Sequence, residues 1–172
     1  MVLSPEAIEH HKDLKMVYTP LHGTGITLVP PTLEAIGFTN IIHVPEQDVI
    51  SGDFPTVVSP NPEEPEALDL AIKKAIETDA EIVMATDPDA DRIGTAIRDA
   101  EGNFMLLNGN QAMLIFFYYL ITRRNELNKL TGKDYIVKTI VSTELVAPIA
   151  HRYGVEMFDC YTGFKWIADI IR

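Results

Sequence analysis

The chain alternates short apolar runs with segments in which apolar residues recur every three or four positions. Short runs of this kind predict β-strands, and the longer spacing predicts helices that pack by one face. From this pattern we expect a short polar helix near the N-terminus, strands at 16–18, 40–44 and 81–85, and helices at 26–36 and 67–76. Strands that alternate with helices are typical of a parallel sheet covered by helices, so the fold class is predicted to be α/β.

Two further stretches refine this first domain. Residues 93–97 and 104–107 flank the turn sequence Ala-Glu-Gly-Asn and predict a β-hairpin. The hairpin makes the expected sheet mixed but mostly parallel, within a three-layer α/β/α arrangement. Residues 45–65 are rich in proline, glycine and acidic side chains, and they are expected to form a long surface loop.

A change of composition at residues 107–110 marks a domain boundary, which gives a first domain at 1–107 and a second segment at 108–172. The second segment opens with a strongly apolar helix at 111–124, whose aromatic residues we interpret as buried core. A strand, a helix, another strand and a last amphipathic stretch follow at 135–141, 144–153, 155–158 and 165–172. We interpret 108–172 as part of a second, similar α/β domain. Exposed strand edges and apolar patches favour pairing, so we expect self-association through residues after about 108.

Composition excludes several classes of function. An apolar share of 47% is ample for a core, and a net charge of −11 argues against nucleic-acid binding, which relies on Lys and Arg. No stretch approaches the roughly 20 apolar residues of a membrane span. The single cysteine, Cys160, permits no internal disulfide and is consistent with a cytoplasmic location.

The strongest chemical signal is the acidic stretch directly after the predicted strand 81–85. Asp87, Asp89 and Asp91 alternate there, and in an extended backbone alternate side chains point to one side. Crowded carboxylates repel one another unless a cation neutralises them, and Mg2+ and Ca2+ both take oxygen ligands. Arg92 follows with a charge suited to phosphate. We therefore predict a site for a metal and a phosphate.

Two alternatives concern this stretch. An EF-hand loop needs glycine at its sixth position and glutamate at its twelfth, where this chain has Arg92 and Arg98, so that class is excluded. A solvated acidic turn, in which Asp87 caps the next element, remains possible from the residues alone. The position beyond the carboxyl end of a strand favours a ligand site, because ligands of open α/β sheets bind there.

A glycine-rich loop at residues 19–25 joins the first strand to the first long helix. Such a loop invites comparison with phosphate-binding loops, but the dinucleotide and Walker signatures are both absent. We assign Gly23 and Gly25 to a tight chain reversal. We interpret His22 as a hydrogen-bonding residue of the loop rather than as a catalyst.

Three motifs at 19–25, 87–92 and 162–165, in this order, resemble the phosphohexomutase family, the phosphoglucomutase/phosphomannomutase group. The similarity covers nearly the whole chain, and the first loop is most similar to phosphoglucomutases and their phosphopentomutase-like relatives. It implies a four-domain enzyme of which this chain is the second domain and the first part of the third. The family's phosphorylated serine belongs to the first domain and its site for substrate phosphate to the fourth.

The resemblance also implies roles for individual residues. Asp87, Asp89 and Asp91 would hold Mg2+ together with an oxygen of the phosphoserine, and Arg92 would contact the phosphoryl group. Thr162 and Gly163 match the sugar-recognition loop, with Lys165 nearby. Lys138 corresponds to a catalytic lysine that faces the cleft in some members, and an exposed lysine at a strand edge is the alternative. The Ser-Pro-Asn-Pro sequence at 59–62 is only superficially like the family's phosphoserine loop, since it lacks the histidine, and we interpret it as ordinary loop.

The implied reaction moves phosphate between the 1- and 6-positions of a hexose, with glucose phosphates the expected substrates, through a phosphoserine and a bisphosphate intermediate. The chain alone is expected to be inactive. Alternatives are a non-catalytic metal-binding α/β module and a phosphopentomutase acting on pentose phosphates. A haloacid-dehalogenase-type phosphatase is disfavoured by the spacing at Pro88 and by the third aspartate. The residues do not select among hexose, pentose and amino sugar.

Overall fold

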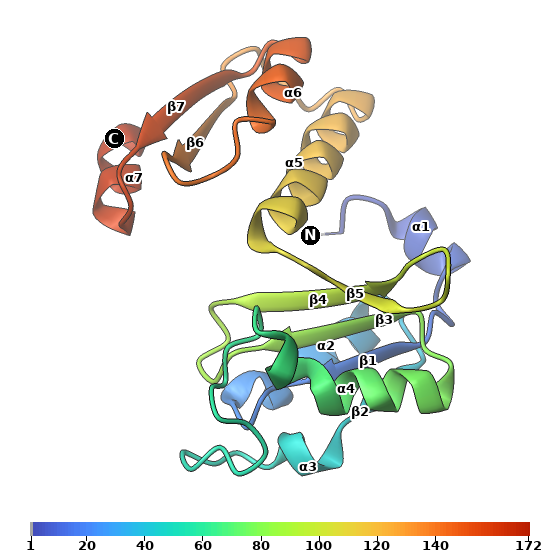
Figure 1. The fold of residues 1–172 in the computed structure, drawn as a ribbon. Coiled ribbons are helices and arrows are strands. Elements are labelled where there is room, and N and C mark those ends of the chain that lie inside the picture. The colour runs from blue at the N-terminus through green and yellow to red at the C-terminus, as the bar shows by residue number, and fades with distance from the viewer. Residues whose placement is uncertain (1) are drawn as a thin grey trace. The chain divides into compact units, whose positions relative to one another are not determined.

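A computed structural model describes residues 2–172 of the chain (Figure 1). The chain divides into two compact units, of which the first extends to Gly109 and the second spans Asn110–Arg172. Each unit has its own sheet and its own apolar core, and the core of the first unit is the larger.

The first unit is built on a five-stranded sheet with the order β2-β1-β3-β4-β5. Its strands are β1 (Met16–Thr19), β2 (Ile41–His43), β3 (Ile82–Thr86), β4 (Ile93–Arg98) and β5 (Phe104–Leu107). Strand β1 pairs in parallel with β2 and β3, whereas β4 is antiparallel to both β3 and β5. Only β4 therefore runs against the other strands of this sheet, which confirms the mixed, mostly parallel arrangement and the hairpin.

Helices cover both faces of this sheet. They are α1 (Pro5–His10), the 3-10 helix η1 (Thr24–Thr27), α2 (Val29–Ile36), α3 (Pro45–Asp48) and α4 (Pro65–Thr78). The connection from β1 through α2 leads outward to β2, and the connection through α4 returns past β1 to β3. Because such crossovers are right-handed, opposite directions of travel place the two helices on opposite faces. Figure 1 shows α4 in front of the sheet and α2 behind it, so the three-layer prediction is confirmed.

The core of the first unit lies between α4 and the central strands. Helix α4 contributes the fully buried side chains of Leu68, Ala71 and Ala75, which pack with Val17 of β1 and Val83 of β3. The small alanines let the helix approach the sheet closely, and the apolar spacing that predicted this helix is also what forms its buried face.

Two local expectations were wrong. The predicted loop at 45–65 contains the short helix α3, which begins with Pro45 and buries Gln47. Proline is well suited to the first position of a helix, so this proline starts a helical turn rather than preventing one. The predicted helix at 26–36 is divided, because η1 forms a 3-10 turn first and α2 starts only at Val29, just before Pro30.

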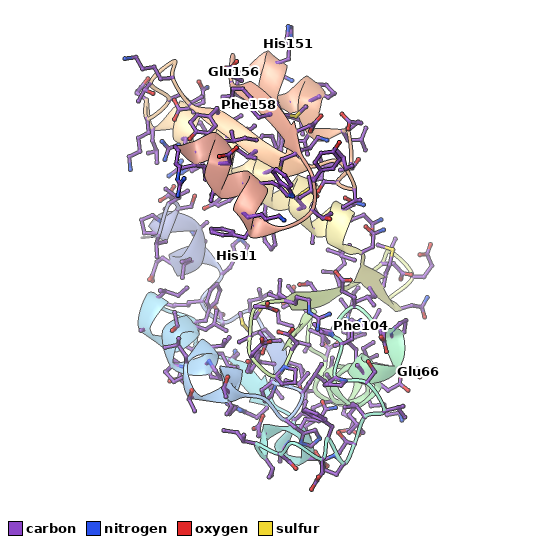
Figure 2. All side chains as sticks on the ribbon, turned by 90° about the vertical axis from the view of Figure 1, so that its left-hand side faces the viewer. His11, Glu66, Phe104, His151, Glu156 and Phe158 are labelled. Atoms are coloured by element: carbon purple, nitrogen blue, oxygen red, sulfur yellow. The ribbon has the colours of Figure 1, made fainter. Side chains whose placement is uncertain are left out.

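Arg98 fastens β4 to the elements around it. Its Nε donates to the carbonyl oxygen of Ala80 at 2.8 Å, and its guanidinium lies 4.8 Å from the ring centroid of Phe104 on β5, which Figure 2 labels. This one side chain thus connects the hairpin to the segment that leads into β3.

The second unit contains a two-stranded parallel sheet. Its elements are α5 (Gly109–Glu126), β6 (Tyr135–Thr139), α6 (Val146–Arg152), β7 (Glu156–Cys160) and α7 (Phe164–Ile171). A small core forms around Ile121, Ala150 and Val155.

Helix α5 is not the buried core helix that its composition predicted. Within it, Ile121 is buried, but Phe116 and Tyr118 are about half exposed, with exposed fractions of 50% and 52%. Two strands and α6 offer too little surface to enclose an 18-residue helix that is apolar around most of its circumference. Nevertheless, no helix among residues 2–172 has the length and apolar character needed to cross a membrane.

Candidate metal centre

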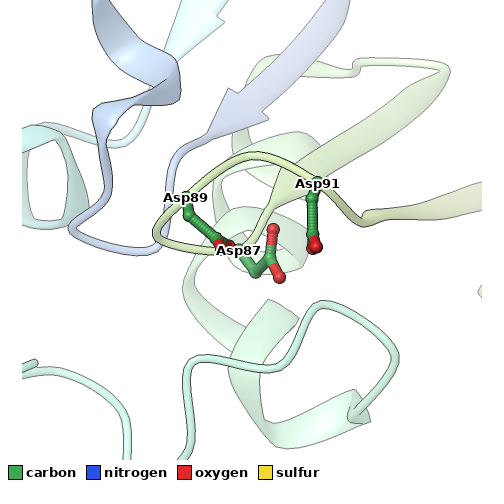
Figure 3. A group of neighbouring side chains, drawn as sticks. All are labelled: Asp87, Asp89 and Asp91. Atoms are coloured by element: carbon green, nitrogen blue, oxygen red, sulfur yellow. The ribbon is translucent and has the colours of Figure 1, made fainter. Parts of the chain in front are cut away.

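The acidic residues form a tight turn at the end of β3 rather than the extended segment that we expected. The carbonyl oxygen of Asp87 accepts a hydrogen bond from the amide of Ala90 at 3.0 Å, and Ala90 adopts a left-handed φ of 60°. The turn still directs the three carboxylates toward one another (Figure 3). One oxygen from each of Asp87, Asp89 and Asp91 lies within 4.8 Å of the others.

The three carboxylates differ strongly in their surroundings. Asp87 is only 1% exposed, whereas Asp89 and Asp91 are open to solvent. The buried member follows β3 directly, so the sheet fixes its position, and the two exposed members extend from the turn. The arrangement has one rigid carboxylate at its base and two at the surface.

Arg92 binds the buried carboxylate through two of its own groups. Its Nε donates to Oδ2 of Asp87 at 2.7 Å, and its backbone amide donates to Oδ1 at 3.0 Å. The same Nε lies 3.8 Å from Oδ1 of Asp91. The side chain of Arg92 is 52% exposed, so the guanidinium is both anchored and accessible from solvent.

These contacts shift the ionisation of the two carboxyls in opposite directions. Burial raises the pKa of Asp87, but the hydrogen bonds from Arg92, the contact with Asp91 and the charge of Arg92 together bring its pKa below the ordinary value. The contact with Asp87, together with the charge of Asp89, raises the pKa of Asp91. The repulsion among the three carboxylates therefore favours the protonated form of the exposed Asp91 and not that of the buried Asp87.

The glycine-rich loop after β1 lies directly against the acidic turn, because β1 and β3 are neighbours and both end at the same edge of the sheet. Thr24 donates to the carbonyl oxygen of Pro88 twice, from its amide at 2.9 Å and from its hydroxyl at 3.1 Å. A Cβ on Gly23 would overlap the backbone of Pro88, so only glycine permits this approach. The tight reversal predicted for Gly23 is also the contact that supports the turn.

The sequence did not indicate the part that Asn61 takes in this site. Its Oδ1 accepts from Nη1 of Arg92 at 3.3 Å, and its amide donates to Glu64 at 3.0 Å, as does the hydroxyl of Ser59 at 3.2 Å. The loop at 59–62 thus orients the arginine. The Asn-Pro pair just before the acidic start of α4 marks only a turn, and no local signal links it to a residue 31 positions away.

The donor set fits a hard divalent cation. Three carboxylates converge within 4.8 Å, one of them buried, and three protein ligands leave positions for phosphate oxygen and water, as Mg2+ usually requires. The nearby guanidinium is positioned for an anion that shares the cation.

Lys138 lies on β6 in the second unit and is not the exposed strand-edge lysine of the simpler interpretation. It is 5% exposed, and its ammonium lies 2.7 Å from both Glu144 and Asp159. The hydrogen bonds that its ammonium donates to Asp159 and Glu144 raise the pKa of Lys138. Its charge is therefore retained and neutralised within the second unit, and a catalytic role for it stays a prediction.

The predicted sugar-recognition residues lie together at the start of α7. Gly163 precedes the helix with a left-handed φ of 118°, and its carbonyl accepts from the amide of Trp166 at 3.0 Å. Lys165 lies over the ring of Trp166, 5.0 Å from its centroid. Thr162, Gly163 and Lys165 are all exposed. The structure thus presents this loop to solvent and holds it by the glycine turn.

Comparison with known proteins assigns both units. Residues 3–102 match the family model described as phosphoglucomutase/phosphomannomutase, alpha/beta/alpha domain II, and residues 108–172 match the model for domain III. A phosphoglucomutase of Staphylococcus saprophyticus is 38% identical over 166 residues, covering 96% of this chain and 29% of that protein. A phosphomannomutase of Mycoplasmoides pirum is 36% identical, covering 96% of this chain and 29% of its own length.

Solved structures show the same fold. A phosphoglucomutase/phosphomannomutase family protein of Burkholderia thailandensis superposes with a TM-score of 0.74 at 22% identity, over 98% of this chain and 35% of that one. An Aspergillus fumigatus N-acetylphosphoglucosamine mutase, solved with GlcNAc-6P and magnesium, gives 0.63 at 16% identity, over 98% and 33%. The chain spans less than a third of the length of the curated relatives named above. With both of its units matched in order, the chain belongs to the phosphoglucomutase/phosphomannomutase family.

Proposed function

We propose that this chain supplies the magnesium site and part of the sugar-recognition surface of a phosphohexomutase. The observation that carries the proposal is the convergence of Asp87, Asp89 and Asp91 beside an anchored Arg92. The magnesium in the Aspergillus fumigatus relative supports the choice of ion. The alternative of a solvated acidic turn, in which Arg92 alone neutralises Asp87, predicts no Mg2+ binding, so a titration separates the two.

The residues of the turn have separate tasks in this proposal. Asp87, Asp89 and Asp91 would hold the ion, which when bound offsets the negative charge of a phosphoryl group in transfer. Arg92 binds the phosphoryl oxygens with the donors that its contact with Asp87 leaves free. Because Asp87 and Asn61 both fix its guanidinium, Arg92 meets the anion with little loss of side-chain freedom.

We further propose hexose phosphates as substrates, with phosphate passing between the 1- and 6-positions through an enzyme phosphoserine and a bisphosphate intermediate. The phosphoglucomutase relatives favour glucose 1-phosphate and glucose 6-phosphate. Thr162, Gly163 and Lys165 would bind the sugar, because they form an exposed loop that offers a hydroxyl, a backbone turn and a cation.

Calorimetric titration with Mg2+ tests the metal site. We expect Asp89→Asn to bind Mg2+ more weakly than the unchanged chain, because it removes one charged ligand and roughly keeps the shape. Asp69→Asn, on the exposed side of α4, makes the same change of charge away from the site and serves as the control. Equal affinities in Asp89→Asn and the unchanged chain would place the ion elsewhere.

The proposal also predicts no mutase activity for the 172-residue chain by itself, because it contains no residue that we assign as the phosphoserine. A coupled assay with glucose 1-phosphate, glucose 1,6-bisphosphate and Mg2+ measures this. Magnesium-dependent turnover by the purified chain would contradict the proposed division of labour.

A further inference from the structure

His22 is a buried residue that the metal site does not use directly. It is 1% exposed, and both of its ring nitrogens have partners. Nδ1 lies 2.9 Å from the carbonyl oxygen of Val49, and Nε2 lies 2.8 Å from the hydroxyl of Thr56. A carbonyl oxygen can only accept, so Nδ1 donates, and Nε2 of that tautomer accepts from the Thr56 hydroxyl.

The hydrogen bonds continue from Thr56 into the interior. Its hydroxyl accepts from the amide nitrogen of Gln47 at 3.2 Å, and the amide oxygen of Gln47 accepts from the hydroxyl of Thr19 at 2.7 Å. The backbone of His22 joins the same network, since its amide donates to the carbonyl of Gln47 at 2.9 Å and its carbonyl accepts from Ser51 at 3.1 Å. The segment 47–56 therefore makes hydrogen bonds with both the ring and the backbone of this histidine.

These hydrogen bonds hold an unusual backbone conformation at residues 21 and 22. Leu21 and His22 have φ values of 47° and 65°, both in the left-handed region that residues other than glycine rarely adopt. Such conformations persist where the surroundings determine them, and they cluster at functional sites. Here the reversal delivers Gly23 and Thr24 to Pro88, whose carbonyl oxygen accepts both bonds from Thr24.

A buried histidine needs hydrogen-bond partners whatever its role, so the presence of partners for both ring nitrogens does not by itself indicate a function. The further observation is where the contacts lead: from an exposed threonine, through the histidine and its reversal, to the peptide between two of the three clustered aspartates. We propose that His22 and Thr56 are positioning residues for the cation site, acting on Asp87–Asp91 through Thr24 and Pro88. This inference rests on the proposed function.

A matched pair of variants at Thr56 isolates the effect. Thr56→Val removes the hydroxyl and keeps the shape of an exposed side chain, so no cavity forms, and Thr56→Ser keeps the hydroxyl. Loss of the two hydrogen bonds of this hydroxyl, to His22 and from Gln47, is expected to weaken Mg2+ affinity about two- to tenfold in Thr56→Val, with Thr56→Ser close to the unchanged chain. Calorimetry with Mg2+ alone, at a temperature where thermal unfolding shows all three chains folded, provides the measurement.

A merely structural role would lower the unfolding temperature of Thr56→Val without changing the Mg2+ affinity of the folded chain, and that outcome would overturn the inference. Amide hydrogen exchange without metal gives an independent readout. Exchange at the amides of Thr24 and Ala90, which donate to Pro88 and Asp87, should quicken in Thr56→Val and not in Thr56→Ser. If even the unchanged chain binds no Mg2+, the proposed function fails, and the exchange data still decide: unchanged rates reject the positioning role and faster rates support it.

Discussion

At the scale of single residues, Asp87 and Asp89 are chemically identical but have different surroundings. Asp87 is buried and accepts two hydrogen bonds from Arg92, whereas Asp89 is exposed. We expect Asp87→Asn to lower the free energy of unfolding by about 1–2 kcal/mol without metal, because it weakens a charge-assisted bond whose arginine is half in solvent. Asp89→Asn should stay within about 0.5 kcal/mol, as for most surface changes.

Urea unfolding of the two variants and the unchanged chain measures this difference. A loss of stability in Asp89→Asn as large as that in Asp87→Asn would mean that the exposed carboxylate contributes as much to the free energy of unfolding as the buried one. Both variants should weaken Mg2+ binding, so the pair separates stability from ligation.

Spacing along the sequence was sufficient to group Asp87, Asp89, Asp91 and Arg92, because these residues lie within one short turn. It did not show that the turn is held by Thr24 or that Arg92 is oriented by Asn61. Those contacts join positions 64 and 31 residues apart, and their geometry depends on which strand ends are neighbours. The sequence identified His22 as a loop hydrogen-bonder, but not its partners.

At the scale of elements, the loop between α5 and β6 depends on one carboxylate. Asp134 accepts from the amide and the hydroxyl of Thr131, and Nη2 of Arg124 donates to it at 3.2 Å. The bond from the amide of Thr131, with those from its hydroxyl and from Arg124, lowers the pKa of Asp134 below 3.8. A lowered pKa in the folded state means stability that is present above 3.8 and is lost as the pH falls through the lowered value.

We therefore expect Asp134→Asn to lower the unfolding temperature of the second unit at neutral pH, with a gap to the unchanged chain that narrows as the pH falls below 3.8. Trp166 is the only tryptophan and lies in this unit, so its fluorescence reports the transition. Asp169→Asn, on the exposed side of α7, is the control. A gap that keeps its size as the pH falls would exclude the ionised carboxylate as its cause.

Elements were predictable where the apolar residues lie on one face that packs against the core. Helix α4 and strand β3 are examples, since the apolar face of α4 packs on the central strands and Val83 of β3 lies in the same core. Helix α5 shows the limit of such reasoning. Its apolar composition predicts that it is buried. Burial, however, depends on whether neighbouring elements cover the helix, and many of its large side chains remain exposed.

At the scale of the whole molecule, that exposed surface predicts association. Ile115 and Phe116 of α5 are 53% and 50% exposed, and contiguous apolar surface favours contact with another chain. We expect the average mass in sedimentation to rise with concentration, and Phe116→Lys to reduce the rise. Leu28→Lys in the first unit, where the leucine is 70% exposed, is the matched control. A mass that stays monomeric at every concentration would show that this surface does not associate.

The double hydrogen bond from Thr24 to Pro88 has a consequence for the kinetics of cation binding. A turn that is already fastened when the chain folds needs no rearrangement when the ion arrives. The slow event is then the release of water from Mg2+, which dehydrates reluctantly. Uptake should follow a single exponential whose rate depends on the ion, so that Mn2+ or Ca2+, which exchange water faster, enter the same three carboxylates more quickly than Mg2+ does.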